Sequence, residues 1–362
     1  GDGSGAVEDY ARLFYALRSA GSRSLGEWLD GRLRDRESPY AALAERGGED
    51  PALEAAARRD IETFTLLAEL DWDQVLAEVG GKAPREYGPV LANLPRWRGS
   101  SPFSFAELTE FYRANGAGLF ARHRAFLWED GALCPVEQPD CPGADEMLGY
   151  ELQRNRVIAN TRAMLEGNLV NNVLLYGDSG TGKSATVKNL LTLPGFEALR
   201  LIEVQKEGLA DLPRLIRTLG GRRLKFILFI DDLAFDQDDK TYSALKTILE
   251  GGLERRPANV AVYATSNRRR LVRQTFSDRA GDEVDASETI QEKTSLSDRF
   301  GLRIPYLALN QAEFLELVEG MAEQAGIALD RDSLRAEAVK WEMRNPGRTP
   351  RTAKQFIASL SL

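Results

Sequence analysis

Apolar side chains recur every three to four residues along the first 145 residues of the chain, which is the spacing of helices with one buried face. Glycine pairs and a proline-containing stretch separate three such segments, and Ser104 and Glu107 have the spacing of a capping box at the start of the third. The segments span Glu8–Ala20, Pro51–Leu70 and Phe105–Trp128. The pattern therefore predicts a mostly helical N-terminal domain over residues 1–145.

The pattern changes near residue 146, where short apolar runs begin to alternate with helical segments. Five runs have the length and composition of buried strands, and a helical segment over 242–253 separates the third from the fourth. The runs are Val173–Tyr176, Leu199–Val204, Phe226–Asp231, Val260–Thr265 and Leu302–Leu307. Strands that alternate with helices form a parallel sheet covered on both faces, so an α/β domain is expected over residues 146–308.

After residue 308 only helical spacing remains. Three stretches show it, at Gln311–Ala325, Ser333–Met343 and Pro350–Leu360. A short helical tail on an α/β core suggests a lid, so a helical lid subdomain is expected over residues 309–362.

Composition narrows the classes of function. The 362-residue chain has a formal net charge of −8, which argues against a globally basic nucleic-acid-binding protein and leaves a local basic surface open. No apolar run approaches the roughly 18 residues of a membrane span, so no membrane partner is expected. Cys134 and Cys141 lie in a proline-rich segment typical of a linker, and with one histidine they are too few for a closed zinc site. A reduced cysteine pair is typical of a cytoplasmic protein.

A glycine-rich segment between the first predicted strand and a helical stretch at Ala185–Leu193 carries the most specific chemical signal. It reads Gly177-Asp178-Ser179-Gly180-Thr181-Gly182-Lys183-Ser184, which is the P-loop pattern. The glycines let backbone N–H groups surround a phosphate chain, Lys183 can reach the β- and γ-phosphates, and the Ser184 hydroxyl can ligate Mg²⁺. The segment therefore predicts a nucleotide site, against the alternative of a chance glycine-rich turn.

The third predicted strand ends in two carboxylates, Asp231 and Asp232, downstream of the glycine-rich segment. This is the Walker B pattern, in which Asp231 would hold Mg²⁺ through water and Asp232 would orient or deprotonate the attacking water. The alternative is a buried strand that runs into an acidic loop. The preceding P-loop favours the catalytic interpretation.

Three later polar residues extend the candidate site. Asn267 follows the fourth predicted strand, where it can hydrogen-bond the γ-phosphate or its attacking water, although asparagine is also common in turns. Arg299 precedes the fifth strand, where it can reach a γ-phosphate across a subunit boundary or pair with Asp298 at the surface. Arg351 lies in the first turn of the last predicted helix, where its charge opposes the helix dipole unless a phosphate or a carboxylate lies nearby.

The order of these motifs resembles the AAA+ superfamily of ATPases over roughly residues 146–362. The resemblance implies an α/β fold class, with a five-stranded parallel P-loop sheet and a C-terminal helical lid beside the mostly helical N-terminal domain. It implies ATP and Mg²⁺ as cofactors. By position it assigns the adenine pocket to Gly149 and Tyr150, Walker A to Gly177–Ser184, Walker B to Asp231 and Asp232, sensor 1 to Asn267, the arginine finger to Arg299 and sensor 2 to Arg351, with Arg348 as second choice.

More narrowly, the residues of three segments resemble an uncharacterised bacterial family of AAA+ ATP-binding proteins, catalogued as a domain of unknown function. The segments are Asn171–Gly177, Ala264–Arg269 and Ser295–Gly301. Two departures from the superfamily matter. Asp232 stands where most members have glutamate, as in bacterial replication initiators and helicase loaders, so hydrolysis is expected to be slow. The loop Gln205–Leu209 lacks the aromatic-apolar-glycine tip of protein-threading members, which disfavours a processive unfoldase.

Two functions fit these residues. The first is an oligomeric ATPase that couples ATP binding and hydrolysis to remodelling or loading of an unidentified protein or nucleic-acid partner. The alternative is a nucleotide-dependent switch or adaptor with little or no turnover. Asp232, Asn267 and Arg299 together favour the ATPase, because a pure binding module does not require them. The resemblance implies a homo-oligomer, because it places Arg299 beside the nucleotide of a neighbouring subunit.

Overall fold

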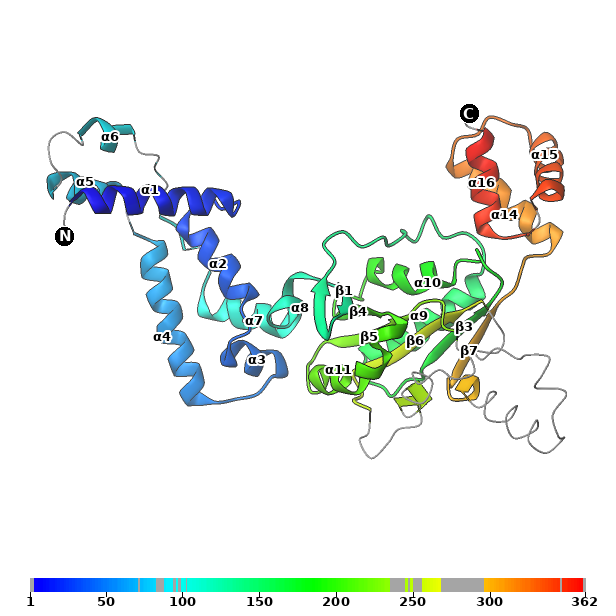
Figure 1. Ribbon diagram of the computed structural model, residues 1–362, viewed down its shortest axis with the longest axis horizontal. Helices are drawn as coiled ribbons and strands as arrows, with labels where there is room; N and C mark the ends of the chain where they lie inside the picture. The colour runs from blue at the N-terminus through cyan, green and yellow to red at the C-terminus, as the bar shows by residue number, and fades with distance from the viewer. Residues whose placement is uncertain are drawn as a thin grey trace. The chain divides into compact units, whose positions relative to one another are not determined.

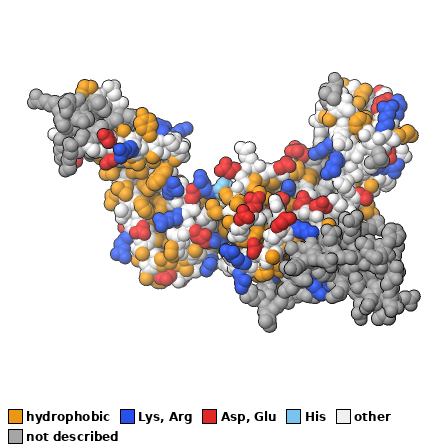
Figure 2. Space-filling model, in the orientation of Figure 1, with side chains coloured by type: hydrophobic (Ala, Val, Ile, Leu, Met, Phe, Trp, Pro, Cys, Tyr) orange, Lys and Arg blue, Asp and Glu red, His pale blue; other side chains and the backbone are white. Residues whose placement is uncertain are grey.

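The computed structural model describes residues 3–70, 72–82, 88–93, 96, 99–101, 103–234, 245, 246, 248, 249, 256–267, 296–345 and 347–360. Contacts divide the chain into two compact units, Gly1–Arg122 and His123–Leu362, which we call the N-terminal unit and the P-loop unit. Within the described ranges, no helix is long and apolar enough to cross a membrane. On the face drawn in Figure 2, acidic and basic side chains are interspersed on both units, without a large field of one sign.

The N-terminal unit is helical, as the sequence predicts. Its helices are α1 (Gly3–Ser19), α2 (Leu25–Asp35), α3 (Pro39–Arg46), α4 (Pro51–Ala68), α5 (Trp72–Lys82), α6 (Gly88–Asn93), α7 (Phe105–Asn115) and α8 (Leu119–Arg122). Side chains that accept backbone N–H groups fix several helix starts. The predicted capping box is present, because Ser104 Oγ accepts the Glu107 N–H at 3.2 Å and Glu107 Oε2 accepts the Ser104 N–H at 2.9 Å.

The helix predicted over Phe105–Trp128 is wrong in its second half. Helix α7 ends at Asn115, because Gly116 and Gly118 adopt φ angles of +83° and +67° that lie outside the helical region. The chain then forms α8 and strand β1 (Ala125–Glu129). Because the apolar spacing continues across the two glycines, the sequence predicted one helix where the structure has α7, α8 and β1.

A mostly parallel sheet forms the centre of the P-loop unit (Figure 1). The five predicted strands are present as β3 (Val173–Gly177), β4 (Leu199–Val204), β5 (Lys225–Ile230), β6 (Val260–Ser266) and β7 (Leu302–Tyr306). The strand order is β2-β1-β4-β5-β6-β3-β7, and every pair except β1–β2 is parallel. The P-loop strand β3 thus lies between β6 and β7, where the strand order reverses and where open α/β sheets bind ligands.

The sheet has seven strands among the described residues, not five, because a hairpin extends it. Strand β1 pairs in parallel with β4, and β2 (Ala132–Pro135) pairs antiparallel with β1. The proline-rich segment near Cys134 was therefore wrongly predicted to be wholly a linker. The division between units falls after Arg122 rather than near residue 145, because the hairpin belongs to the sheet.

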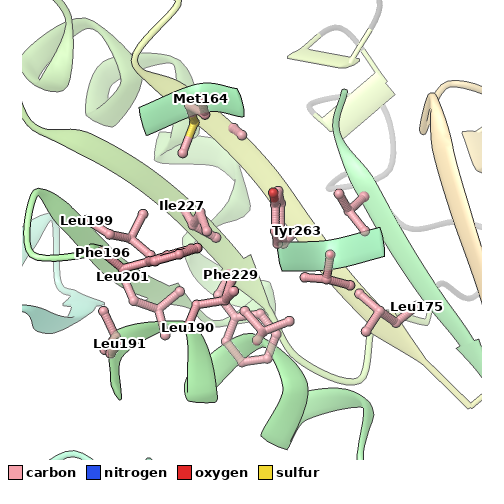
Figure 3. Packing of buried hydrophobic residues seen from close by; sticks show 14 of the residues in the cluster. Met164, Leu175, Leu190, Leu191, Phe196, Leu199, Leu201, Ile227, Phe229 and Tyr263 are labelled. Carbon is pink, nitrogen blue, oxygen red and sulfur yellow. The ribbon is translucent and has the colours of Figure 1, made fainter. Parts of the chain in front are cut away.

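The central strands are buried on both faces, which explains their nearly continuous apolar sequence. One face packs against α9 (Glu151–Leu165), α10 (Lys183–Asn189) and the segment that follows α10. Met164 of α9 and Leu190 and Phe196 of that segment share a core with strand residues (Figure 3). Helix α11 (Leu212–Leu219) is strongly amphipathic and buries four residues of its own. This packing holds the carboxyl ends of β3, β5 and β6 in fixed positions.

Three helices follow the sheet, at α14 (Gln311–Gln324), α15 (Arg331–Arg344) and α16 (Pro350–Leu360), close to the predicted ranges. They share a hydrophobic core that includes Phe314, Leu334 and Phe356. The fold class predicted from the sequence is confirmed in outline: a mostly parallel α/β sheet that carries the P-loop, three C-terminal helices and a mostly helical N-terminal part. The lid as a separate subdomain from residue 309 remains a prediction. The helix expected over 242–253 lies largely outside the described residues, as do residues 268, 269 and 295 of the family-like segments.

Candidate nucleotide site

A cavity of about 550 Å³ opens at the carboxyl ends of β3, β5 and β6. It is lined by segments that lie far apart in the sequence and that the sequence analysis singled out for nucleotide chemistry. Its lining includes Gly149, Tyr150, Ser179, Gly180, Thr181, Gly182, Lys183, Ser184, Asp231, Asp232, Asn267 and Arg351. The fold therefore brings most of the predicted site residues around one space.

The P-loop leaves β3 through a glycine that no other residue could replace without a shift. Gly177 has a φ of +138°, and a Cβ atom there would lie 2.1 Å from the Tyr306 carbonyl oxygen of β7. Gly180 and Gly182 also adopt positive φ angles, and Gly182 is the N-cap of α10. The loop can thus turn tightly and aim backbone N–H groups toward the cavity.

Lys183 is buried, with 6% of its surface exposed, and its ammonium group is fully engaged. Its Nζ donates to Gly177 O at 3.2 Å, to Asp178 O at 2.7 Å and to Asn267 Oδ1 at 2.9 Å. Burial lowers the pKa of this ammonium, whereas nearby carboxylates, Asp178 foremost, favour the charged form. The P-loop lysine is therefore held at the cavity wall by three acceptors.

Asp231 accepts two hydroxyl groups through one carboxylate oxygen. Ser184 Oγ donates to Asp231 Oδ1 at 2.6 Å, and Thr265 Oγ1 donates to the same atom. Ser184 and Asp231 are the two residues predicted to hold Mg²⁺, and the fold places their oxygens side by side. Oxygen donors of this kind are what Mg²⁺ prefers.

Asp232 adopts a left-handed backbone, with a φ of +50°, which is uncommon for a residue other than glycine. Its N–H donates to Thr265 Oγ1 at 2.9 Å, and its Oδ1 accepts Asn267 Nδ2 at 2.8 Å. Asn267 therefore bridges Lys183 and Asp232 through its two amide atoms. Backbone strain of this sort often accompanies a functional site, and here it turns the carboxylate toward the cavity lining.

The lid contributes the first turn of α16. Thr349 caps this helix, because its Oγ1 accepts the Thr352 N–H at 3.3 Å. The Arg351 N–H donates to Gly180 O at 3.2 Å, and its Nη1 donates to Ser179 Oγ at 3.3 Å. Arg348 instead pairs with Glu342 at 2.6 Å and is absent from the cavity lining. Of the two arginines, Arg351 lines the cavity, and its sensor 2 role remains a prediction.

Tyr150 lines the cavity but is also part of the framework behind it. Its OH donates to Leu307 O at 2.6 Å, and its ring stacks on Tyr306 with 5.1 Å between ring centroids. Burial raises the pKa of both phenols, to about 12 for Tyr306. The Tyr306 OH and Thr186 Oγ1 are hydrogen-bonded at 2.9 Å. The adenine-pocket role of Gly149 and Tyr150 remains a prediction.

Arg299 is not among the residues that line the cavity. It follows a short helical turn, and its N–H donates to Leu296 O at 3.3 Å. Asp298, the surface partner considered for it, accepts Arg303 Nη1 at 2.6 Å. The cavity therefore does not bring Arg299 together with the other predicted site residues, and its arginine-finger role remains a prediction.

Sequence reasoning missed several residues of the site, among them Thr265, Tyr306, Lys354 and Gln355. Thr265 bonds both Walker B aspartates, and Tyr306 supports the P-loop from β7. A hydroxyl at the carboxyl end of a buried apolar strand was the available signal for Thr265. Lys354 and Gln355 also line the cavity, and their helical spacing from Arg351 could have identified them.

Comparison with solved structures gives distant likenesses. The Holliday junction branch migration motor RuvB of Thermotoga maritima is 17% identical, with a TM-score of 0.38. The match covers 61% of this chain and 63% of the RuvB chain. The ORC1 protein of Aeropyrum pernix, solved in complex with DNA, is 17% identical with a TM-score of 0.42, and covers 60% of each chain. The chain thus spans less than two thirds of the length of these proteins, and nothing about activity follows at this level of likeness.

A search of curated proteins finds no match. The match to a protein family, in contrast, extends over residues 121–361, which include every residue of the cavity lining. It begins one residue before the end of the N-terminal unit and so covers essentially the whole P-loop unit. The chain belongs to the family described as "Protein of unknown function (DUF815)".

Proposed function

We propose that this chain is an AAA+ ATPase that uses Mg²⁺ and couples ATP binding and hydrolysis to remodelling or loading of a protein or nucleic-acid partner. The observation that carries the proposal is a continuous hydrogen-bonded path across the cavity wall. Lys183 donates to Asn267, and Asn267 donates to Asp232. The path links the phosphate-binding lysine to the carboxylate that would activate water.

ATP binding would rest on the P-loop and the lid. The glycine-rich turn supplies backbone N–H groups, and Lys183 supplies one positive charge for the β- and γ-phosphates. Arg351 supplies a second charge from the first turn of α16, beside Ser179 and Gly180. Its proximity to the P-loop explains why a cation is tolerated at a helix start, because bound phosphate would offset it.

The residues present fit a magnesium ion. Ser184 Oγ and Asp231 Oδ1 lie 2.6 Å apart and both are hard oxygen donors. In the described part of the chain, no cluster of three or more His, Cys, Asp or Glu side chains could hold a metal by itself. Ser184 and Asp231 would therefore hold Mg²⁺ together with nucleotide phosphates, whose charge the ion would offset.

Hydrolysis would require Asp232 to orient and deprotonate water. Its carboxylate lines the cavity, and the Asn267 amide holds one of its oxygens at 2.8 Å. The same Asn267 side chain would connect phosphate binding to Asp232, because its Oδ1 accepts Lys183 Nζ. The Asp232 side chain is one methylene shorter than that of glutamate, so its carboxylate would lie farther from the attacking water. We therefore expect slow turnover.

We further propose a cytoplasmic homo-oligomer. Arg299 lies outside the cavity lining of its own chain, as expected for a residue that acts on a neighbouring subunit. Cys134 and Cys141 are free thiols, the state typical of a reducing compartment. The interspersed charges of Figure 2 do not favour nucleic acid over protein as the partner.

The test separates binding from turnover. MgATP affinity and phosphate release are measured, across protein concentrations, for the parent, Lys183→Ala and Asp232→Asn. Two matched controls remove the same groups elsewhere: Lys188→Ala on the same helix, and Asp140→Asn in an exposed loop.

We expect Lys183→Ala to abolish high-affinity binding, because it removes the one P-loop side-chain charge aimed at the phosphates. Asp232→Asn should keep binding and lose at least about 100-fold in turnover, because an amide cannot accept the proton of water. Parent protein that binds ATP without turnover at any concentration would indicate the switch alternative. Parent protein that does not bind ATP would refute the proposal.

A further inference from the structure

The segment that joins the sheet to the lid is held at three consecutive residues. Leu307 O accepts the Tyr150 OH at 2.6 Å, and the Ala308 N–H donates to Asp178 Oδ2 at 2.7 Å. The Leu309 N–H donates to Arg348 O at 2.9 Å. The partners in these bonds lie in the segment before α9, in the P-loop and in the loop before α16. The hinge (307–309) is therefore attached to all three segments.

Asp178 is the one P-loop residue that reaches the hinge through its side chain among these bonds. A carboxylate in a phosphate-binding loop is unfavourable if it faces the phosphates, because like charges repel. Within the P-loop, the cavity lining begins at Ser179 and does not include Asp178. The Asp178 carboxylate accepts the Ala308 N–H instead. The side chain therefore serves the hinge rather than the phosphate chain.

The backbone of Asp178 is tied to the phosphate-binding lysine. Its carbonyl oxygen accepts Lys183 Nζ at 2.7 Å and Thr181 Oγ1 at 2.8 Å, and its N–H donates to Tyr306 O at 2.9 Å. A lysine ammonium has three donors, and all three are in use here. Lys183 must give up at least one of these acceptors when it binds a phosphate oxygen, and the Asp178 carbonyl is one of them.

The lid has a second attachment to the same loop. The Arg351 N–H donates to Gly180 O, two residues beyond Asp178. A shift of the P-loop would thus move the lid at both its hinge and the start of α16. The position of Arg351 over the phosphates then depends on where the hinge is held.

From this geometry we infer that Asp178 is a positioning residue that couples the P-loop to the lid hinge through its bond to the Ala308 N–H. It sets the lid position that places Arg351 over the phosphates. The inference deepens the proposed function and rests on it, because it describes how nucleotide occupancy would be passed to the lid.

The experiment follows the Ala308 amide directly. Hydrogen exchange is measured by mass spectrometry on overlapping peptides that resolve residue 308, first in nucleotide-free protein and then with MgATP. The variants are Asp178→Ala, which removes the acceptor, and Asp178→Asn, which keeps a neutral one. Asp330→Ala is the matched control, because Asp330 Oδ1 caps the Ser333 N–H at 3.0 Å in the lid, away from the hinge.

In nucleotide-free protein we expect Asp178→Ala to speed exchange at Ala308 about tenfold and Asp178→Asn about threefold, because a neutral acceptor holds the N–H less tightly. Asp330→Ala should speed exchange at Ser333 and leave Ala308 unchanged. ATP affinity should fall about fivefold in Asp178→Ala, and not in the control, because the lid is no longer held over the site.

Equal exchange at Ala308 in the parent and both Asp178 variants would overturn the inference. So would faster exchange with unchanged ATP affinity, because the contact would then be structural only. Asp178→Asn keeps the test decisive if Asp178→Ala does not fold. A parent that fails to bind ATP would refute the proposed function, whereas Ala308 exchange without nucleotide would still decide whether Asp178 holds the hinge.

Discussion

Both units bury charged or polar side chains, but they use them differently. In the N-terminal unit, Glu45 is 1% exposed and its Oε2 accepts the Ala117 N–H at 3.2 Å, between the end of α3 and the turn after α7. In the P-loop unit, Lys183 is 6% exposed and contacts two carbonyls and the Asn267 side chain. Each buried charge is partnered, as the cost of desolvation requires.

The difference lies in what surrounds the partners. Glu45 satisfies a backbone group at the junction of two helices, and the neighbouring Tyr40–Thr109 bond likewise joins α3 to α7. The Lys183 contacts open onto a cavity that the ends of three strands share. Burial of charge alone does not identify a functional site. A group of several polar side chains that face one cavity is a better indicator of a functional site.

The largest expected effect concerns Arg299, the predicted catalytic residue that does not line the cavity. If it acts on the nucleotide of a neighbouring subunit, Arg299→Ala should lower turnover by about 1,000-fold or more and change ATP affinity little. Phosphate release and ATP binding measure the two quantities. Arg303→Ala is the control, because Arg303 lies nearby and pairs with Asp298.

Mixing variants sharpens this prediction. Arg299→Ala and Lys183→Ala should each be inactive, yet a mixed oligomer can place an intact P-loop beside an intact Arg299. Partial activity should therefore return on mixing, and parent activity should rise with protein concentration. Activity that is independent of concentration, with no rescue while subunits exchange, would exclude the trans-acting role.

Glu45 provides the next largest effect and tests the other side of the comparison. Glu45→Ala leaves the buried Ala117 N–H without this acceptor, so we expect a loss of about 2 kcal/mol in the free energy of unfolding of the N-terminal unit. Hydrogen exchange within α3 and α7 measures that loss. ATP affinity should be unchanged.

The exposed neighbour Glu49 gives the control, because Glu49→Ala removes the same group without burial. The comparison would fail if Glu45→Ala weakened ATP binding as strongly as it weakened the helical unit. It would also fail if Glu49→Ala had the same effect on exchange as Glu45→Ala.

The sequence predicted those parts of the fold that depend on local pattern. Apolar runs located all five core strands, and Gly177 to Ser184 located the turn after β3. Strand β1 was missed because it continues a helical pattern across Gly116 and Gly118, and β2 was missed because it runs into the proline-rich segment near Cys134. Pairing of β1 with β4, and of β2 with β1, makes them strands. Such non-local pairing leaves a weak local signal.

The candidate site was predictable in its residue types and not in its contacts. Motif order selected Lys183, Asp232 and Asn267, but the bridge that Asn267 makes between the other two depends on the register of neighbouring strands. The hinge role of Asp178 depends on a backbone N–H at position 308, far along the chain. Backbone groups carry no sequence signature, so no motif could reveal the contact between Asp178 and Ala308.

The smallest expected effect tests whether the lid is held by surface charge as well as by its core. Glu319 on α14 accepts Arg331 Nε at 2.9 Å and also Arg335 Nε, both from α15, and these bonds lower its pKa from 4.5 to about 2. A lowered pKa means that the folded lid binds the proton less tightly than the unfolded chain does. The stabilisation is thus complete above pH 4.5 and is lost as the pH falls toward 2.

Glu319→Gln should therefore destabilise the lid at neutral pH by about 1 kcal/mol, because solvent screens this partly exposed cluster. It should also flatten the loss of lid stability between pH 4.5 and pH 2, which the titration of Glu319 causes. Hydrogen exchange in α14 and α15 at several pH values measures both effects. The control is Glu323→Gln, an exposed change on the same helix, which should alter neither the stability of the lid nor its acid sensitivity. A Glu319→Gln variant with the acid sensitivity of the parent would show that the lid depends on its apolar core alone.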